Sequence, residues 1–136
     1  MIIRLAIALV ALFGISVPAF AATLDTTQRL ICSSISASEC GKSGDCNGGL
    51  ASEINVPQFF FIDLAKRNVE ATRPDGTELD TKFTMTARDN EPIILQGAED
   101  GRGWSATINR ETGGLVIAVS GSDVAFSVFG ACIQAG

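Results

Sequence analysis

Hydrophobic and polar residues alternate along much of the chain. The clearest case is the segment 82–88, in which Phe83, Met85 and Ala87 are separated by polar residues. The segment 104–109, Trp-Ser-Ala-Thr-Ile-Asn, repeats the same alternation. A period of two places every second side chain on the same face, which is typical of half-buried antiparallel strands. The pattern therefore predicts an all-β protein.

Turn-forming residues separate the alternating segments. Gly, Pro, Asp and Asn cluster between them, as in Arg-Pro-Asp-Gly at 73–76 and Asp-Gly-Arg-Gly at 100–103. Such clusters favour tight reversals between neighbouring strands. No window has the hydrophobic spacing of a convincing amphipathic helix, and residues 50–54 can form at most a turn or two. We expect strands over residues 28–35, 58–64, 68–72, 81–88, 92–99, 103–110, 114–121 and 123–132.

About eight short strands joined in sequence order form a small antiparallel up-and-down meander. A meander is stable when it buries one face and protects its edge strands, so we expect closure into a barrel or a curled sheet. A two-sheet sandwich is the alternative. An eight-stranded barrel is just wide enough to be filled by its own side chains or to hold one small ligand. A filled interior is the favoured interpretation, with Phe59, Phe61, Phe83, Met85, Ile93, Leu95, Trp104, Ile108, Ile117, Val119, Phe126 and Val128 inside.

The first 21 residues have the layout of a secretory signal peptide. Arg4 precedes an apolar run from Leu5 to Val17, and Ala19-Phe20-Ala21 supplies the small residues of a cleavage site. The apolar run is shorter than the roughly 20 residues that cross a bilayer as a helix. We therefore expect residues 1–21 to be a signal peptide and residues 22–136 a single β-domain, periplasmic or secreted.

The charge balance limits the class of partner. The chain has ten Lys and Arg against fifteen Asp and Glu, and loss of Arg4 leaves nine cations and a net charge of −6. An acidic chain without a basic run lacks the electrostatic footprint for nucleic acid or anionic membranes. Cleavage also leaves no membrane anchor. The expected partner is a protein, a cell-envelope component or a small molecule.

The four cysteines predict two disulfides, because export brings thiols into an oxidising compartment. Cys40 and Cys46 flank a short glycine-containing turn, which leaves Cys32 to join the first strand to the last through Cys132. Pairings of Cys32 with Cys40 or Cys46 stay open, since four cysteines allow three arrangements. The chain has no histidine and no Cys-x-x-Cys spacing, so we expect no metal centre, no redox centre and no cofactor.

Catalytic constellations are missing from the sequence. Without histidine or tyrosine, a Ser-His-Asp or Cys-His system and a phenolic acid or nucleophile are excluded. None of Lys42, Lys66 and Lys82 follows a serine at the spacing of Ser-Lys catalysis. Glycoside hydrolysis would need two carboxylates facing each other across a cleft. We expect a non-enzymatic protein.

Two places in the sequence are candidate binding sites. Asp100, Arg102 and Trp104 combine both charges with the only tryptophan at the entry to a strand, and tryptophan and arginine are frequent anchors of interfaces. The competing interpretation is a hairpin turn with Trp104 capping one end of the core. Asp63 ends an apolar run and is the second candidate. Its competing interpretation is a turn-starting aspartate that bonds the backbone of residues 65–67.

The signal peptide, Cys32 in the first strand, the meander and Cys132 in the last strand together resemble the small periplasmic inhibitors of c-type lysozyme. That resemblance implies an eight-stranded barrel whose terminal strands are tied by a disulfide and which blocks lysozyme with a loop. The segment 119–123, Val-Ser-Gly-Ser-Asp, resembles the inhibitory loop, whereas the Cys40–Cys46 turn and the Phe-Phe-Phe run at 59–61 depart from the family. The ending Phe-Gly-Ala-Cys at 129–132 is similar to that of small exported proteins of Gram-negative bacteria.

Three functions follow from these patterns, in order of preference. The first is a non-enzymatic periplasmic binding or inhibitor-type domain that acts on a protein or cell-envelope partner through its loop ends. The second is a carrier of a small apolar ligand, which requires a partly hollow barrel. The third is a carboxylate hydrolase, which requires two facing acids.

Overall fold

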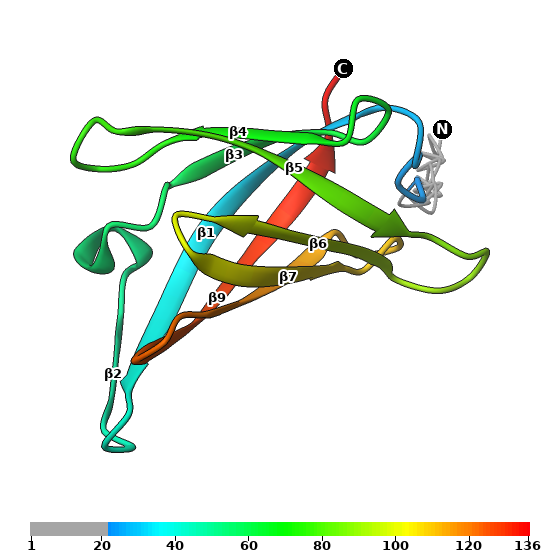
Figure 1. The fold of residues 1–136 in the computed structure, drawn as a ribbon. Helices are drawn as coiled ribbons and strands as arrows, with labels where there is room; N and C mark the ends of the chain where they lie inside the picture. Colours follow the sequence, from blue (N-terminus) through cyan, green and yellow to red (C-terminus); the bar gives the residue numbers. More distant parts are fainter. Residues whose placement is uncertain (1–21) are drawn as a thin grey trace, which may run out of the picture.

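Antiparallel pairing of eight strands produces a closed barrel in this computed structural model (Figure 1). The structure describes residues 22–136, and the signal peptide expected over residues 1–21 lies outside them. Neighbours in sequence pair from β3 to β9, and β1 closes the barrel by pairing with both β3 and β9. The strands are β1 (Arg29–Gly41), β2 (Cys46–Gly49), β3 (Phe59–Asp63), β4 (Asn68–Thr72), β5 (Glu78–Thr86), β6 (Ile93–Glu99), β7 (Arg102–Ile108), β8 (Gly114–Ser120) and β9 (Val124–Gln134).

The expected meander and its closure into a barrel are confirmed, and the sandwich alternative is wrong. The expected strands also match to within three residues at each end, the strand expected over 81–88 being β5 at Glu78–Thr86, apart from two larger differences at the N-terminal end. β1 continues to Gly41, and β2 pairs with its second half as a hairpin that projects from the barrel (Figure 1). Residues 36–49 are mostly small and polar, so their hydrophobic pattern gives no strand signal. Pairing with β9 on one side and β2 on the other holds the second half of β1 extended.

A β-bulge lets β1 follow the curvature of the barrel. Ser34 pairs with Gly130 and Ser36 pairs with Phe129, so Ile35 has no partner on β9 and is exposed. The inward face of β1 shifts at this point from even-numbered to odd-numbered residues, as expected for one extra residue in a strand. A Cβ on Gly130 would collide with the Ser33 carbonyl oxygen, so glycine lets β9 approach the bulge closely.

The register of β3 corrects one part of the predicted interior. Phe59 and Phe61 point outward and are 48% and 52% exposed, whereas Phe60 and Ile62 are buried. Three consecutive phenylalanines contain no alternation, so the sequence does not indicate which of them face the interior of the barrel. The register places Ile62 beside buried Leu30 and Val69, and this pairing turns Phe59 and Phe61 to the outside.

The two ends of the barrel differ in how they are filled. At the end that holds the β3–β4, β5–β6 and β7–β8 turns, Leu64, Ile93, Ile108 and Leu115 are each at most 2% exposed. Leu24, from the segment before β1, is also buried in this cluster. The expectation of a filled interior is therefore right for this closed end, and the opposite end is hollow, as described below.

Both predicted disulfides are present. Cys32 and Cys132 are direct partners across β1 and β9, and both are buried in the core. Cys40 and Cys46 are direct partners across the β1–β2 hairpin. The two bridges indicate an oxidising environment for the folded chain. Within residues 22–136, no helix is long and apolar enough to span a membrane.

The two bridges should contribute unequally to stability. Removing the Cys32–Cys132 bridge, which spans 100 residues, with paired alanine substitutions is expected to lower the free energy of unfolding by about 4–5 kcal/mol. The same change at Cys40 and Cys46, six residues apart, should cost about 2 kcal/mol. Urea unfolding of the two double variants measures the difference. A larger loss for the hairpin bridge would contradict the assignment of Cys32–Cys132 as the main constraint.

Candidate functional site

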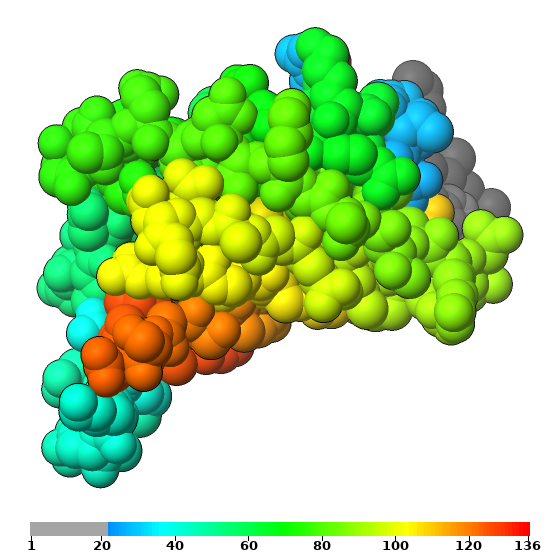
Figure 2. Space-filling model, viewed as in Figure 1, coloured from blue at the N-terminus to red at the C-terminus, as the bar shows by residue number. Residues whose placement is uncertain are grey.

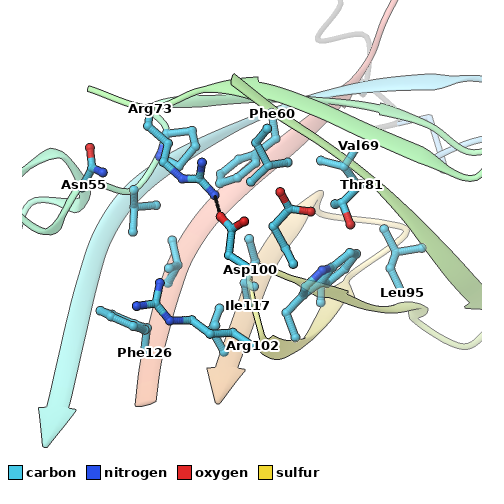
Figure 3. A pocket seen from close by; sticks show the side chains of 18 of the residues that line it. Asn55, Phe60, Val69, Arg73, Thr81, Leu95, Asp100, Arg102, Ile117 and Phe126 are labelled. Atoms are coloured by element: carbon cyan, nitrogen blue, oxygen red, sulfur yellow. Dashed lines mark hydrogen bonds and ion pairs between the residues drawn. The ribbon is translucent and has the colours of Figure 1, made fainter. Parts of the chain in front are cut away.

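A cavity of about 160 Å³ occupies the open end of the barrel (Figure 3). Its wall is built by inward side chains of β3 to β9 and by the segment between β2 and β3. Because exposed Asn55, Asp100 and Arg102 are among its lining residues, the cavity reaches the surface. The apolar part of the wall consists of Ile54, Val56, Pro57, Phe60, Ile62, Val69, Leu79, Leu95, Trp104, Ala106, Leu115, Ile117, Val119, Phe126 and Val128.

Two small residues in neighbouring strands shape this part of the barrel: Ala106 lines the cavity, and Gly97 leaves room for the ring of Trp104. Gly97 and Ala106 both occupy inward positions, where larger residues fill the closed end. A Cβ on Gly97 would overlap the six-membered ring of Trp104, so the indole lies directly against the backbone of β6. The edge of Trp104 also meets Phe83, with ring centroids 6.4 Å apart and planes at 68°. Gly97 and Phe83 therefore fix the tryptophan in the wall.

A tight turn brings charged side chains to the mouth of the cavity. Asp100 and Gly101 have φ values of 50° and 73° and connect β6 to β7 as a two-residue hairpin loop. This turn makes Glu99 and Arg102 direct partners on the inner face of the sheet. Figure 2 shows the β6–β7 turn in yellow at the surface, between the green β4–β5 turn and the orange β8–β9 turn.

An ion pair connects two of the turns around the mouth. Arg73 Nη2 lies 3.3 Å from Asp100 Oδ2, so the β4–β5 turn is tied to the β6–β7 turn (Figure 3). Asn55 donates from Nδ2 to Asp75 at 2.8 Å, which holds the β2–β3 segment against the β4–β5 turn. Hydrogen bonds from Thr77, and then from Asn55, hold the pKa of Asp75 below its ordinary value. These contacts pre-organise the rim.

Three polar groups at the cavity have no polar partner in the described part of the chain. The Arg102 guanidinium lies over the Phe126 ring, 5.6 Å from its centroid, and makes no ion pair or side-chain hydrogen bond there (Figure 3). Glu99 likewise makes no ion pair or side-chain hydrogen bond with residues 22–136, although it lines the cavity. Within the same range, the indole N–H of Trp104 has no acceptor.

The structure brings three of the four candidate binding residues together. Asp100, Arg102 and Trp104 all line the cavity, and Trp104 packs against Phe83 in the wall instead of capping one end of the core. Asp63 lies at the closed end and accepts a hydrogen bond from the Lys66 amide at 2.9 Å. That bond, and then the Arg29 side chain, hold the pKa of Asp63 below its ordinary value. The turn-starting interpretation of Asp63 is confirmed, and its binding role stays a prediction.

Sequence reasoning missed Arg73, Glu99 and Phe126 as parts of this site. Arg73 and Phe126 come from turns or strands far from residue 100 in sequence, and only barrel closure makes them neighbours. Glu99 directly precedes the predicted turn, so strand alternation could have placed it on the same face as Leu95. Across residues 22–136, no group of three or more His, Cys, Asp or Glu residues is placed to hold a metal ion.

Comparisons with protein families, curated proteins and solved structures found no match for this chain. Function must therefore be argued from the site itself. The arrangement combines an apolar cavity, a few polar groups at its mouth and a rim held by the Arg73–Asp100 ion pair and the Asn55–Asp75 hydrogen bond. Such a concave, mostly apolar site with a few placed polar groups is the usual form of a small-molecule site.

Replacing Gly97 tests whether this glycine fixes the cavity wall. Gly97→Ala is expected to displace the Trp104 ring, because the new methyl group would overlap it. The emission of Trp104, the only tryptophan in the chain, should shift in wavelength or intensity. Gly48→Ala in β2 is the matched control, because its Cβ would make only an ordinary contact. Equal emission spectra for wild type and Gly97→Ala would contradict the assignment.

Proposed function

We propose that this chain is an exported, non-enzymatic binding domain that takes the apolar group of a small ligand into the open end of its barrel. The observation that carries the proposal is the cavity of about 160 Å³ with an apolar wall and a charged mouth. For comparison, an engineered protein cavity of roughly 150 Å³ lined by aliphatic and aromatic side chains binds benzene. The expected signal peptide and the two disulfides support a periplasmic or secreted location.

The proposal favours the carrier interpretation over the loop-binding interpretation of the sequence. Packing at the closed end and the Cys32–Cys132 disulfide between β1 and β9 hold the barrel together, so the cavity does not have to form when the ligand arrives. A pre-formed site avoids part of the ordering cost of binding. The groups at the mouth are charged or hydrogen-bonding, so they can orient a polar head while the apolar group enters the barrel.

A cavity-filling variant tests this proposal. Toluene is expected to stabilise the wild type against heat and to perturb the resonances of cavity residues, because a ligand that binds only the folded state raises its stability. Ala106→Leu places a larger side chain into the cavity and should abolish both effects. Ala118→Leu is the matched control, since Ala118 is exposed on the outer face of the adjacent strand β8. Identical toluene responses in Ala106→Leu and wild type would overturn the proposal.

A protein partner is the second candidate, supported by the outer surface. Phe59, Phe61, Phe129 and Ile133 are all about half or more exposed on β3 and β9, which both pair with β1. The β8–β9 turn at residues 121–123, which carries part of the segment similar to the inhibitory loop, also lies at the open end. Exposed apolar surface of this kind is a frequent feature of protein interfaces.

The inhibitor form of this second candidate has a direct assay. If c-type lysozyme is the partner, a molar excess of the chain should slow the clearing of a bacterial cell-wall suspension. Replacing Ser122 and Asp123 together by alanine should restore clearing, because both lie in the exposed turn. An unchanged lysozyme rate at large excess of the wild type would remove the inhibitor form.

A further inference from the structure

The charges at the cavity mouth are not all neutralised by one another. Arg73 and Asp100 form an ion pair at 3.3 Å, which leaves Arg102 and Glu99. These two are direct partners across the β6–β7 hairpin and both line the cavity, yet no nitrogen of Arg102 lies within 4.0 Å of a Glu99 carboxylate oxygen. The Arg102 cation and the Glu99 anion therefore lie at the same rim, and neither has an ionic partner among residues 22–136.

Phe126 accounts for the separation of this pair. The guanidinium of Arg102 lies over the Phe126 ring on β9, and this cation–π contact holds it away from β6. A guanidinium that rests on a ring keeps its N–H groups available in its own plane, where they can bind a carboxylate through two parallel hydrogen bonds.

Net charge at the mouth selects among possible head groups. Two cations and two anions line it, and the mature chain is acidic overall. A simple anion would be opposed by Glu99, and a simple cation by Arg102. A head group that carries both charges on one carbon offers a complementary group to each of the two residues and adds no net charge.

We propose that the ligand is an α-amino acid with an apolar side chain, whose carboxylate is bound by Arg102 and whose ammonium is bound by Glu99. The side chain occupies the barrel cavity. Its volume of about 160 Å³ suits a benzyl or branched aliphatic group and is too small for the acyl chain of a lipid. This inference rests on the proposed function, because it names the ligand class of the same cavity.

A ligand series that shares one aromatic ring separates the contributions of the two charges. L-Phenylalanine carries both, 3-phenylpropionate only the negative one, 2-phenylethylamine only the positive one, and toluene neither. Titration followed by Trp104 fluorescence, excited where phenylalanine does not absorb, or by calorimetry gives each dissociation constant. L-Phenylalanine should bind at least about tenfold more tightly than either singly charged analogue, because each analogue lacks one of the two charged hydrogen-bonding groups.

Variants that remove one charge test which residue binds the carboxylate of the ligand and which residue binds its ammonium group. Arg102→Gln should weaken the binding of L-phenylalanine and of 3-phenylpropionate, and it should leave the binding of 2-phenylethylamine unchanged. Glu99→Gln should weaken the binding of L-phenylalanine and of 2-phenylethylamine. It should strengthen the binding of 3-phenylpropionate, because the substitution removes a negative charge that repels the carboxylate. Arg88→Gln and Glu91→Gln are the matched controls, since this exposed pair lies at the closed end and should leave every constant unchanged.

The outcomes distinguish this inference from the proposed function. If toluene binds the wild type but L-phenylalanine binds no more tightly than 3-phenylpropionate, or Glu99→Gln leaves L-phenylalanine binding unchanged, the amino-acid assignment is overturned and the cavity remains a binding site. If no member of the series, toluene included, binds the wild type, the proposed function fails as well.

Discussion

Closure of β1 on β9 is the constraint on which the rest of the structure depends. A meander of this length leaves two unpaired edges unless its first and last strands meet, and open edges invite pairing with other chains. The register between β1 and β9 runs from Leu30 to Gly41 on one side and from Gln134 to Val124 on the other, interrupted only by the bulge at Ile35. Cys32 and Cys132 lock this pairing covalently inside the core. The strands that line the cavity are then parts of a single closed sheet, so the positions of Phe126 on β9 and Trp104 on β7 are fixed relative to each other.

The cavity is a consequence of how side-chain size is distributed along that closed sheet. At one end, leucine and isoleucine point inward from several strands and leave no space, and Leu24 covers them. Toward the other end the inward positions of β6 and β7 hold Gly97 and Ala106, followed by the charged pair Glu99 and Arg102. Charged side chains do not fill a dry interior, because burying them without partners costs several kcal/mol. The barrel therefore ends in a wet, polar rim around an apolar space.

Local chemistry made much of this fold predictable, and long-range pairing explains what was missed. Even cysteine number, period-two alternation and turn residues predicted two disulfides and most of the strands, and they favoured closure of the meander over a sandwich. The phase of β3 could not be read from Phe59 to Phe61, because three identical side chains look the same in either register. The second half of β1 lacked a hydrophobic signal altogether. Of the site, Asp100, Arg102 and Trp104 are neighbours in sequence and were found, whereas Arg73 and Phe126 join them only through closure.

The groups at the cavity mouth that have no polar partner in the part of the chain that the structure describes are consistent with the binding function proposed above. All four cysteines are in disulfides, and the chain contains neither histidine nor tyrosine. The side-chain groups that face the cavity without a polar partner among residues 22–136 are one guanidinium, one carboxylate and one indole N–H. The guanidinium and the indole are hydrogen-bond donors, and the carboxylate is an acceptor. These groups can orient a charged head, and the apolar wall behind them can hold what that head carries.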